Sequence, residues 1–469
     1  MRLFNTLTRT LEPLEPLEPG HVRLYTCGPT VYDFAHIGNF RTYVWEDLLR
    51  RTLKFLGFRV TQVMNITDIE DKIIAKAMAQ KATIGEVTEP FIRAFFEDLD
   101  TLRIERAESY PRATEHIAEM LTIADDLKAK GLTYESEGSL YFRIDAFPTY
   151  GRLSNLEKRE LKVGARVDND EYEKDDARDF VLWKGHREGE PSWDSPFGEG
   201  RPGWHLECSA MSMKYLGPSF DLHTGGVDNI FPHHENEIAQ SEGATGKPFV
   251  KYWMHAAHLM VDGEKMSKSK GNFYTLRDLV AKGHDPRALR YLLLNTHYRT
   301  PLNFTFDALA RAAGELQRFD ALFARFAETR AAVGRDAAFD AKAEAMELEI
   351  REALADDLNV SGAQGALFRL VREANAALDR GELPSDSLAS LQERLARIDG
   401  VYGVIAPGEK ALLDPEVDAL IEQRVQARKA KNFKESDRIR DLLASQGIVL
   451  EDTPQGVRWR RAVAGREGG

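Results

Sequence analysis

The stretch from His21 to Gly57 decides the fold: HVRLYTCGPTVYDFAHIGNFRTYVWEDLLRRTLKFLG. Its first six residues, His21–Thr26, are β-prone and lead into a Gly-Pro turn. Apolar residues at helical spacing follow from about Ile37 and end at Gly57, and Phe58–Met64 predicts a second strand. Strand, helix and strand in this order predict the opening of a parallel α/β sheet.

Composition limits the class of protein. The chain has 469 residues and a net charge of −12, which predicts roughly three or more structural units and excludes a wholly basic nucleic-acid binder. Only two cysteines, Cys27 and Cys208, are present, which is typical of a cytoplasmic protein without a disulfide scaffold. We expect no signal peptide and no membrane span. The Leu-Glu-Pro repeat within Leu11–Gly20 predicts an extended surface segment.

The rest of the chain predicts a divided catalytic domain followed by helical modules. We expect a Rossmann-like catalytic domain in two halves (1–110 and 201–250) around a connective insertion (111–200) with a hairpin near Leu140–Ile144. A stem-contact region (251–306) and a helical bundle (307–400) should follow, then a small α+β module (409–469). The bundle prediction rests on an apolar helix face at Leu309, Leu316, Phe319, Phe323 and Phe326, and on helical stretches at Ala341–Asp357 and Ser361–Asp379.

The first chemical motif is His36-Ile37-Gly38-Asn39, at the start of the expected helix. Gly38 lets a ligand approach the backbone closely, and the free N–H groups of a helix N-terminus attract a nucleotide phosphate. His36 and Asn39 add side-chain donors for the same anion. Taken alone, the motif also fits a histidine that only caps a helix.

A second motif, Lys265-Met266-Ser267-Lys268-Ser269, follows more than two hundred residues later. Two lysines among hydroxyl groups and next to a glycine predict a mobile cationic loop for ATP phosphates, although a solvated surface loop has the same composition. In this order, the two motifs resemble the HIGH and KMSKS signatures of class I aminoacyl-tRNA synthetases. Asn39 replaces the final histidine of the first signature.

A candidate metal site joins the two cysteines to the run His233-His234-Glu235-Asn236-Glu237. If the chain is helical here, His233 and Glu237 are one turn apart and share a face. An imidazole and a carboxylate at that spacing, with two thiolates, can bind one zinc ion. Each cysteine alone also fits a small buried apolar residue, and His234 and Glu235 remain alternative ligands.

Six strings are similar to the cysteinyl-tRNA synthetase family, and the similarity runs from Phe4 to about Arg461: CGPTVYDFAHIGN, NITDIEDKI, GWHLECSAM, GGVDNIFPHHENEIAQS, KMSKSKGN and EDTPQGVRW. The resemblance implies one zinc ion per subunit, held by Cys27, Cys208, His233 and Glu237. It implies an amino-acid pocket of Gly28, Thr67, Trp204, His223 and Asp228. It implies that the residues acting on ATP, with magnesium, are His36, Gly38, Asn39, Lys265 and Lys268.

The implied activity is that of a ligase. ATP would activate L-cysteine to cysteinyl-adenylate, and the cysteinyl group would pass to the 3′ end of tRNA(Cys). Zinc can separate a thiol from the hydroxyl of serine, so we expect no editing domain. The resemblance also implies a cytoplasmic monomer.

The C-terminal module carries the RNA prediction. One basic helix should begin near Asp414 and Pro415 and end near Leu443, with a patch at Arg424, Arg428, Lys429, Lys431, Lys434, Arg438 and Arg440. A solvated helix balanced by acidic residues is the alternative. With the resemblance, the candidates for anticodon contacts are Arg428, Phe433, Asp437 and Asp452.

Two rival functions share parts of this pattern. A cysteine ligase of mycothiol synthesis would have the zinc site and both signatures but should lack the full C-terminal module. A noncatalytic tRNA-binding paralogue should have lost His36 or the lysines of the second signature, and both are present.

Overall fold

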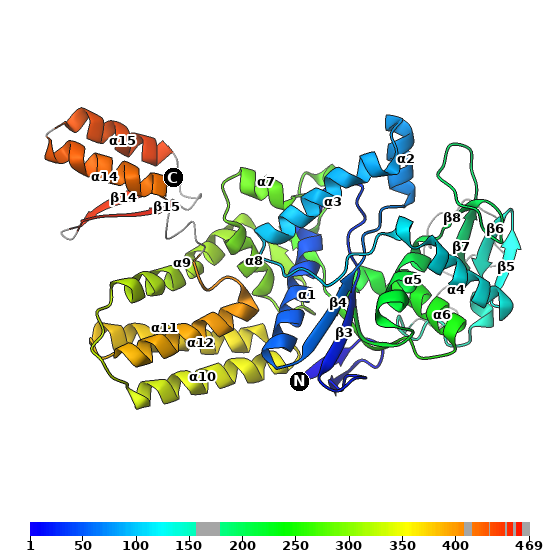
Figure 1. Ribbon diagram of the computed structural model, residues 1–469, viewed down its shortest axis with the longest axis horizontal. Coiled ribbons are helices and arrows are strands. Elements are labelled where there is room, and N and C mark those ends of the chain that lie inside the picture. Colours follow the sequence, from blue (N-terminus) through cyan, green and yellow to red (C-terminus); the bar gives the residue numbers. More distant parts are fainter. Residues whose placement is uncertain (156–178, 408–414, 431, 446–447, 454–455, 462–469) are drawn as a thin grey trace. The chain divides into compact units, whose positions relative to one another are not determined.

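The computed structural model describes residues 1–155, 179–407, 415–430, 432–445, 448–453 and 456–461 (Figure 1). The chain divides into two compact units. The first contains Met1–Leu276, Leu293–Asn303 and Leu348–Ala366, and the second contains Arg277–Leu292, Phe304–Glu347 and Leu367–Gly469. Among the described residues, no helix combines the length and the apolar character needed to cross a membrane.

A four-stranded parallel sheet forms the centre of the first unit, which confirms the predicted α/β class. Its strand order is β10 (Val250–Ala256), β9 (Phe220–Gly226), β3 (His21–Thr26) and β4 (Arg59–Met64). Helix α1 (Ile37–Phe55) joins β3 to β4 and lies beside both strands in Figure 1. The predicted strand–helix–strand unit is therefore confirmed.

The region between β4 and β9 carries a group of helices and a separate antiparallel sheet. That sheet has the order β5 (Thr133–Ser136), β6 (Ser139–Phe142), β7 (Phe180–Gly185) and β8 (Gly200–Pro202). The helices are α2 (Asp71–Gln80), α3 (Ile84–Thr101), α4 (Ile117–Ala129) and α5 (Trp204–Leu216). Helix α6 (Glu235–Thr245) joins β9 to β10.

The Leu-Glu-Pro repeat runs along the edge of the central sheet. β1 (Arg2–Asn5) pairs with β2 (Thr10–Pro13), at the start of the repeat. The Tyr252 hydroxyl donates to the Pro13 carbonyl at 2.8 Å, and the Leu17 amide donates to Asp221 at 2.6 Å. These contacts tie the extended segment to β10 and β9.

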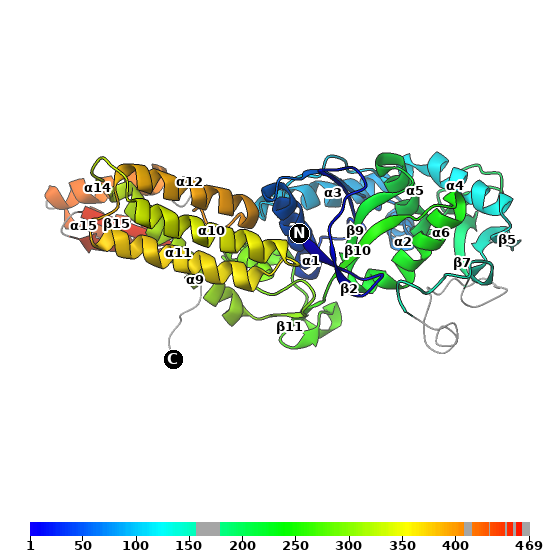
Figure 2. The same cartoon turned by 90° about the horizontal axis from the view of Figure 1, so that it is seen from below.

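Helices dominate the rest of the chain. Figure 2 shows α9, α10, α11 and α12 running alongside one another. Buried residues of α9 include Leu309, Leu316, Phe319 and Phe326, as predicted, whereas Leu322 is buried in place of the partly exposed Phe323. The remaining elements are β11 (Leu259–Val261), β12 (Glu264–Lys265), α7 (Leu276–Ala281), α8 (Pro286–Leu294), β13 (Leu302–Phe304), α9 (Phe306–Glu328), α10 (Ala337–Ala355), α11 (Val360–Asp379) and α12 (Ser385–Tyr402).

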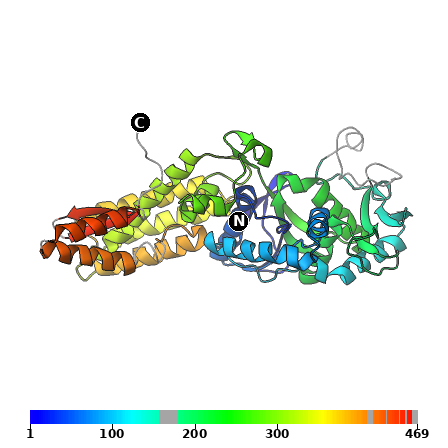
Figure 3. The same cartoon turned by 90° about the horizontal axis from the view of Figure 1, so that it is seen from above.

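The C-terminal module has its own small core, and its helical prediction was wrong in one respect. It contains two helices, α14 (Pro415–Lys429) and α15 (Phe433–Ser445), which pack side by side (Figure 3), followed by the hairpin β14 (Ile448–Thr453) and β15 (Gly456–Arg461). Asn432 begins the second helix, because its side chain accepts a hydrogen bond from the Glu435 amide at 3.2 Å. The basic residues are therefore divided between two helices.

Candidate active site and metal cluster

The site lies at the carboxyl edge of the central sheet, between β3 and β9. These strands are parallel neighbours, with Tyr25 opposite His223 and Thr26 opposite Thr224. From β3 the chain continues through α1 to β4 on one side, and from β9 it continues through α6 to β10 on the other. The two connections leave in opposite directions, so they open a crevice at the strand ends, where ligands bind in sheets of this kind. Cys27 is the first residue after β3.

Four predicted ligands meet in this crevice. The ligand atoms of Cys27, Cys208, His233 and Glu237 all lie within 4.8 Å of one another. Cys208 comes from α5, and Glu237 comes from the first turn of α6. His233 lies in the turn before α6, with its Nε2 atom 3.1 Å from Glu237 Oε1. The predicted one-turn spacing of His233 and Glu237 on a common face is confirmed.

A second group overlaps the first. Cys27 and Glu237 also lie within 4.8 Å of the nitrogen atoms of His223 and His234. His223 Nε2 is 2.9 Å from Glu237 Oε2, and His234 Nε2 is 3.2 Å from Cys27 Sγ. The sequence offered His234 as an alternative ligand, and the family resemblance placed His223 in the amino-acid pocket. The structure therefore keeps His234 as an alternative ligand and adds His223 to the candidates. We call Cys27, Cys208, His223, His233, His234 and Glu237 the metal cluster.

Glu235 does not belong to the cluster. Its Oε1 atom accepts from the Gly151 amide at 2.8 Å, and its Oε2 atom accepts from the Ser154 amide and hydroxyl at 2.8 and 2.9 Å. Both carboxylate oxygens thus accept hydrogen bonds from Gly151 and Ser154. Glu235 was a possible metal ligand from sequence spacing alone, and its contacts now disfavour that role.

The electrostatics of the cluster suit a cation. Burial raises the pKa of Glu237 to about 8, and a hydrogen bond with Cys208 together with burial raises the pKa of the Cys27 thiol. Burial also lowers the pKa values of His223 and His234 far below their usual range, which keeps both imidazoles neutral. Two thiols, neutral imidazoles and a buried carboxyl are the donor set that zinc prefers, and a divalent ion would favour their deprotonated forms.

The His36–Asn39 motif forms the N-terminus of α1. His36 Nδ1 accepts from the Asn39 amide at 3.1 Å, and Asn39 Oδ1 accepts from the His36 amide at 3.0 Å. This reciprocal pair is a capping box, so His36 does cap the helix, and Asn39 completes the cap with its side chain. The capped end also lines the cavity described below, so capping does not remove these residues from the site.

The Lys265–Ser269 loop lies against this helix end. A side chain at Gly38 would come within 3.0 Å of the Met266 methyl group, which shows how closely the two motifs approach. The Lys268 ammonium group forms an ion pair with Asp33, which raises the pKa of the lysine. Lys265 is exposed. The structure thus brings together two motifs that the sequence separates widely.

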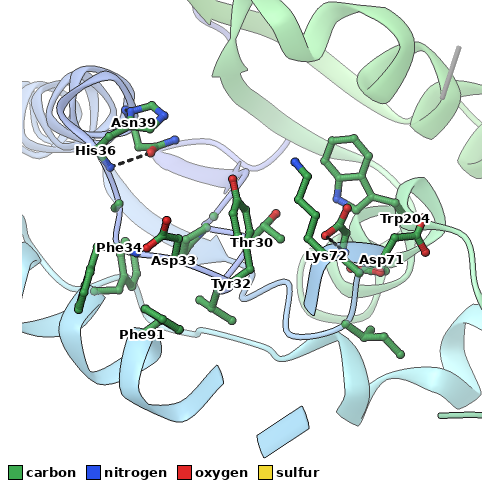
Figure 4. A pocket seen from close by; sticks show the side chains of 18 of the residues that line it. Thr30, Tyr32, Asp33, Phe34, His36, Asn39, Asp71, Lys72, Phe91 and Trp204 are labelled. Carbon is green, nitrogen blue, oxygen red and sulfur yellow. Dashed lines mark hydrogen bonds between the residues drawn. The ribbon is translucent and has the colours of Figure 1, made fainter. Parts of the chain in front are cut away.

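A cavity of 460 Å³ opens beside the His36–Asn39 motif (Figure 4), and its lining includes Asp33, the ion-pair partner of Lys268. Of the predicted residues, Gly28, His36, Asn39 and Trp204 line it. The Trp204 ring lies 4.6 Å from the His233 ring, so the cavity and the metal cluster are neighbours. The lining residues that the sequence prediction missed include Tyr32, Asp33, Phe34, Lys72, Phe91 and Glu207.

Gly28 lines the cavity, and Thr67 lies behind the loop that carries Gly28. A side chain at Gly28 would come within 1.7 Å of the Asn65 carbonyl oxygen, so only glycine fits. Thr67 is buried, and its backbone joins the loop after β3 through Thr67 N to Pro29 O at 3.0 Å. Asp228 is exposed near the end of β9 and is not among the lining residues. Glu207, next to Cys208, is buried. The sequence prediction did not include it, although a charged residue in a mostly apolar segment is a usable signal of a functional site.

The four proposed anticodon contacts remain predictions. Arg428 lies in the last turn of α14 and is exposed, and the Phe433 side chain at the start of α15 is 61% exposed. Asp437 lies 3.3 Å from Arg440 within α15. Asp452 lies in β14, and its side chain is outside the described part of the structure.

Comparisons with known proteins identify the class. The family profile described as "tRNA synthetases class I (C) catalytic domain" matches residues 13–314, and the fold is similar to that of Mycobacterium tuberculosis methionyl-tRNA synthetase. That similarity has a TM-score of 0.57 at 16% identity and covers 81% of this chain and 89% of the other. The fold and the two signature motifs define a class I aminoacyl-tRNA synthetase.

The relatives narrow the class further. Cysteine–tRNA ligases of Leptospira interrogans (strain 56601) and Solibacter usitatus are each 50% identical, over 98% of this chain and 99% of theirs. Profiles for a DALR domain and for a cysteinyl-tRNA ligase anticodon binding domain match residues 349–406 and 411–460. The chain belongs to the cysteine–tRNA ligase family. The match at 411–460 covers the module that the mycothiol-type ligase should lack.

Proposed function

We propose that this chain activates L-cysteine with ATP and transfers the cysteinyl group to tRNA(Cys), with one zinc ion held by Cys27, Cys208, His233 and Glu237. The observation that carries the proposal is the meeting of these four ligand atoms within 4.8 Å, beside the capped start of α1. Family membership supports the ligase activity, and the donor set supports zinc.

The residues of the cluster fit zinc on physical grounds. Glu237 Oε1 is buried and accepts no hydrogen bond from the described residues, although His233 Nε2 lies 3.1 Å from it. A buried oxygen without a hydrogen bond is costly, and a bound cation would satisfy it. Zinc, when bound, would take the substrate thiolate and lower its pKa, a preference that the oxygen of serine cannot match. Because the metal would select cysteine over serine when the amino acid binds, we expect no editing domain.

The remaining residues position ATP and the amino acid. The positive end of the α1 dipole, with the side chains of His36 and Asn39, would attract ATP phosphates, while Lys265 and Lys268 would neutralise charge in the transition state with magnesium. The cysteine carboxylate would attack the α-phosphorus, breaking its bond to the pyrophosphate leaving group. Gly28, Thr67, Trp204, His223 and Asp228 would orient the amino acid. No side chain is required as a general base.

The second step and the RNA contacts complete the proposal. A terminal ribose hydroxyl of the tRNA would attack the adenylate carbonyl, and AMP would leave. Arg428 and Phe433 would contact the anticodon, because cations track phosphates and an exposed aromatic ring stacks on unpaired bases. The family resemblance adds Asp437 and Asp452 as further contacts. We propose that the working enzyme is a cytoplasmic monomer.

Cysteine-dependent ATP–pyrophosphate exchange, followed by charging of tRNA(Cys), tests the proposal. We expect exchange with cysteine and at least about a hundredfold less with serine, because one well-placed recognition contact can discriminate on this scale. Exchange with serine or methionine in place of cysteine would refute the substrate. Charging that survives complete zinc removal would refute the metal role.

A further inference from the structure

Glu46, in the middle of α1, is a buried carboxyl group that the proposed mechanism does not use. Its exposed fraction is 0%, and its Oε1 atom accepts from the Thr224 hydroxyl at 2.7 Å. Its Oε2 atom has no hydrogen-bond partner among the described residues. Buried carboxyl groups without full pairing are expensive, so a residue of this kind calls for an explanation.

Thr224 lies between Glu46 and the metal cluster. It is in β9, opposite Thr26 at the end of β3, and its carbonyl accepts from the Cys27 amide at 3.4 Å. It directly follows His223, whose imidazole contacts Glu237 at 2.9 Å. One threonine therefore joins α1 through its side chain and the cluster through its backbone.

We propose that Glu46 is a positioning residue: through Thr224 it fixes the end of β9, and with it Cys27, relative to α1, the helix that His36 caps. This rests on the proposed function, in which that helix binds ATP and the cluster binds the cysteine side chain. The two reactants must meet within about 3–3.5 Å for attack, so the distance between helix and cluster controls the rate. Supports that lock the groups of a site in place have large effects on metal affinity and activity.

The burial of Glu46 supports this role. Burial raises its pKa to about 8, so the carboxyl is largely protonated at neutral pH and does not add a negative charge beneath the cluster. A neutral carboxyl group that accepts one hydrogen bond can hold the Thr224 hydroxyl at a fixed distance from α1. Glutamine has the same shape and retains an acceptor oxygen, whereas methionine has similar length and no acceptor.

Three variants and a control separate positioning from simple stability. Thr224→Val and Glu46→Met each remove the hydrogen bond, and Glu46→Gln retains it. Thr88→Val is the matched control, because Thr88 is also buried and its hydroxyl bonds only the Ile84 carbonyl of its own helix. Each full-length protein is measured for zinc dissociation with a competing chelator, and for the KM values of cysteine and ATP in pyrophosphate exchange.

We expect Thr224→Val and Glu46→Met to raise the zinc dissociation constant and the KM for cysteine about tenfold, the scale seen when the support of a metal ligand is lost. The KM for ATP should stay within about twofold, since α1 keeps its own cap. Glu46→Gln and Thr88→Val should match the wild type, and the Glu46→Met/Thr224→Val protein should be no worse than the worse single variant.

Two results would overturn the inference. One is a lower melting temperature with unchanged zinc affinity and cysteine KM, which would make the pair purely stabilising. The other is an equal rise in both KM values, which would indicate general distortion. A wild-type protein without zinc or without cysteine-dependent exchange would instead refute the proposed function, so the two failures are distinguishable.

Discussion

The choice between His233 and His234 as zinc ligand gives the sharpest test of the site. Both imidazoles lie within reach of Cys27 or Glu237, and the second nitrogen atom of each faces another histidine. His233 Nδ1 is 2.7 Å from His205 Nδ1. His234 Nδ1 is 2.8 Å from His255 Nε2, and His255 Nδ1 is 2.8 Å from the Thr6 hydroxyl. This chain fixes the His234 ring so that its Nε2 atom can donate to Cys27 Sγ. The candidate group with both cysteines and Glu237 contains His233, whereas the group with His234 lacks Cys208. We therefore expect His234 to orient a ligand and His233 to be one.

The two roles predict different losses. His234→Ala removes only an orienting contact, which weakens zinc binding by about tenfold. His233→Ala removes one of four ligands, and we expect at least about a hundredfold weaker binding, beyond the range for orienting residues. At a zinc concentration a hundred times the original dissociation constant, the second variant should lose up to about 2.7 kcal/mol of zinc-dependent stability.

Zinc content after dialysis and competition with a chromogenic chelator measure both effects. His116→Gln is the control, because His116 is equally buried but bonds Arg112 and Tyr215 outside the cluster. Wild-type zinc affinity in His233→Ala, combined with loss of zinc in His234→Ala, would refute the assignment. The metal would then be held by Cys27, His223, His234 and Glu237.

Four further outcomes are expected. In the metal-free protein, the raised pKa of Glu237 means that the folded state holds a proton on this carboxyl group, and the stability this proton contributes is present below about pH 4.5 and is lost as pH rises to about 8. Zinc binds the deprotonated carboxylate, so the gain in melting temperature on adding zinc should grow from pH 6 to pH 8. A gain that stays constant over this range would contradict the prediction. Lys268→Ala should lower kcat for pyrophosphate exchange by about a hundredfold, as for other lost transition-state contacts, and an unchanged kcat would remove it from the mechanism. Gly28→Ala should abolish exchange or folding, because the new methyl group meets the Asn65 carbonyl at 1.7 Å; full activity would show that the loop can move. Deleting the residues after Gly408 should spare exchange and reduce tRNA charging, and equal loss of both would indicate a structural role.

Local patterns predicted the catalytic core well. The strand His21–Thr26 and the helix starting at Ile37 were predicted with their observed first residues, because apolar periodicity and the capping motif are local signals. The spacing of His233 and Glu237 was also readable, since one helical turn determines it. Each of these features depends on residues close together in the chain.

Features that depend on distant pairing were not predictable. The approach of His223 to Cys27 follows from the pairing of β3 with β9, which no local pattern encodes. The contacts of Glu235 depend likewise on Ser154, 81 residues away. The break between α14 and α15 was missed for another reason: no glycine or proline marks it, and the Asn432 cap with Glu435 three residues later was overlooked.

The run His233–Glu237 has a consequence for attempts to shorten this protein. Glu237 faces the metal cluster, while Glu235 and Asn236 hold the segment before residue 156: Tyr150 donates to Asn236 at 2.5 Å, and Gly151 donates to Glu235. Asn236 and Glu235 are fully buried. A minimal synthetase made by excising the predicted insertion would leave a carboxylate and an amide without their partners, within two residues of the proposed ligand Glu237. Any such miniaturisation must replace these partners as well as close the chain.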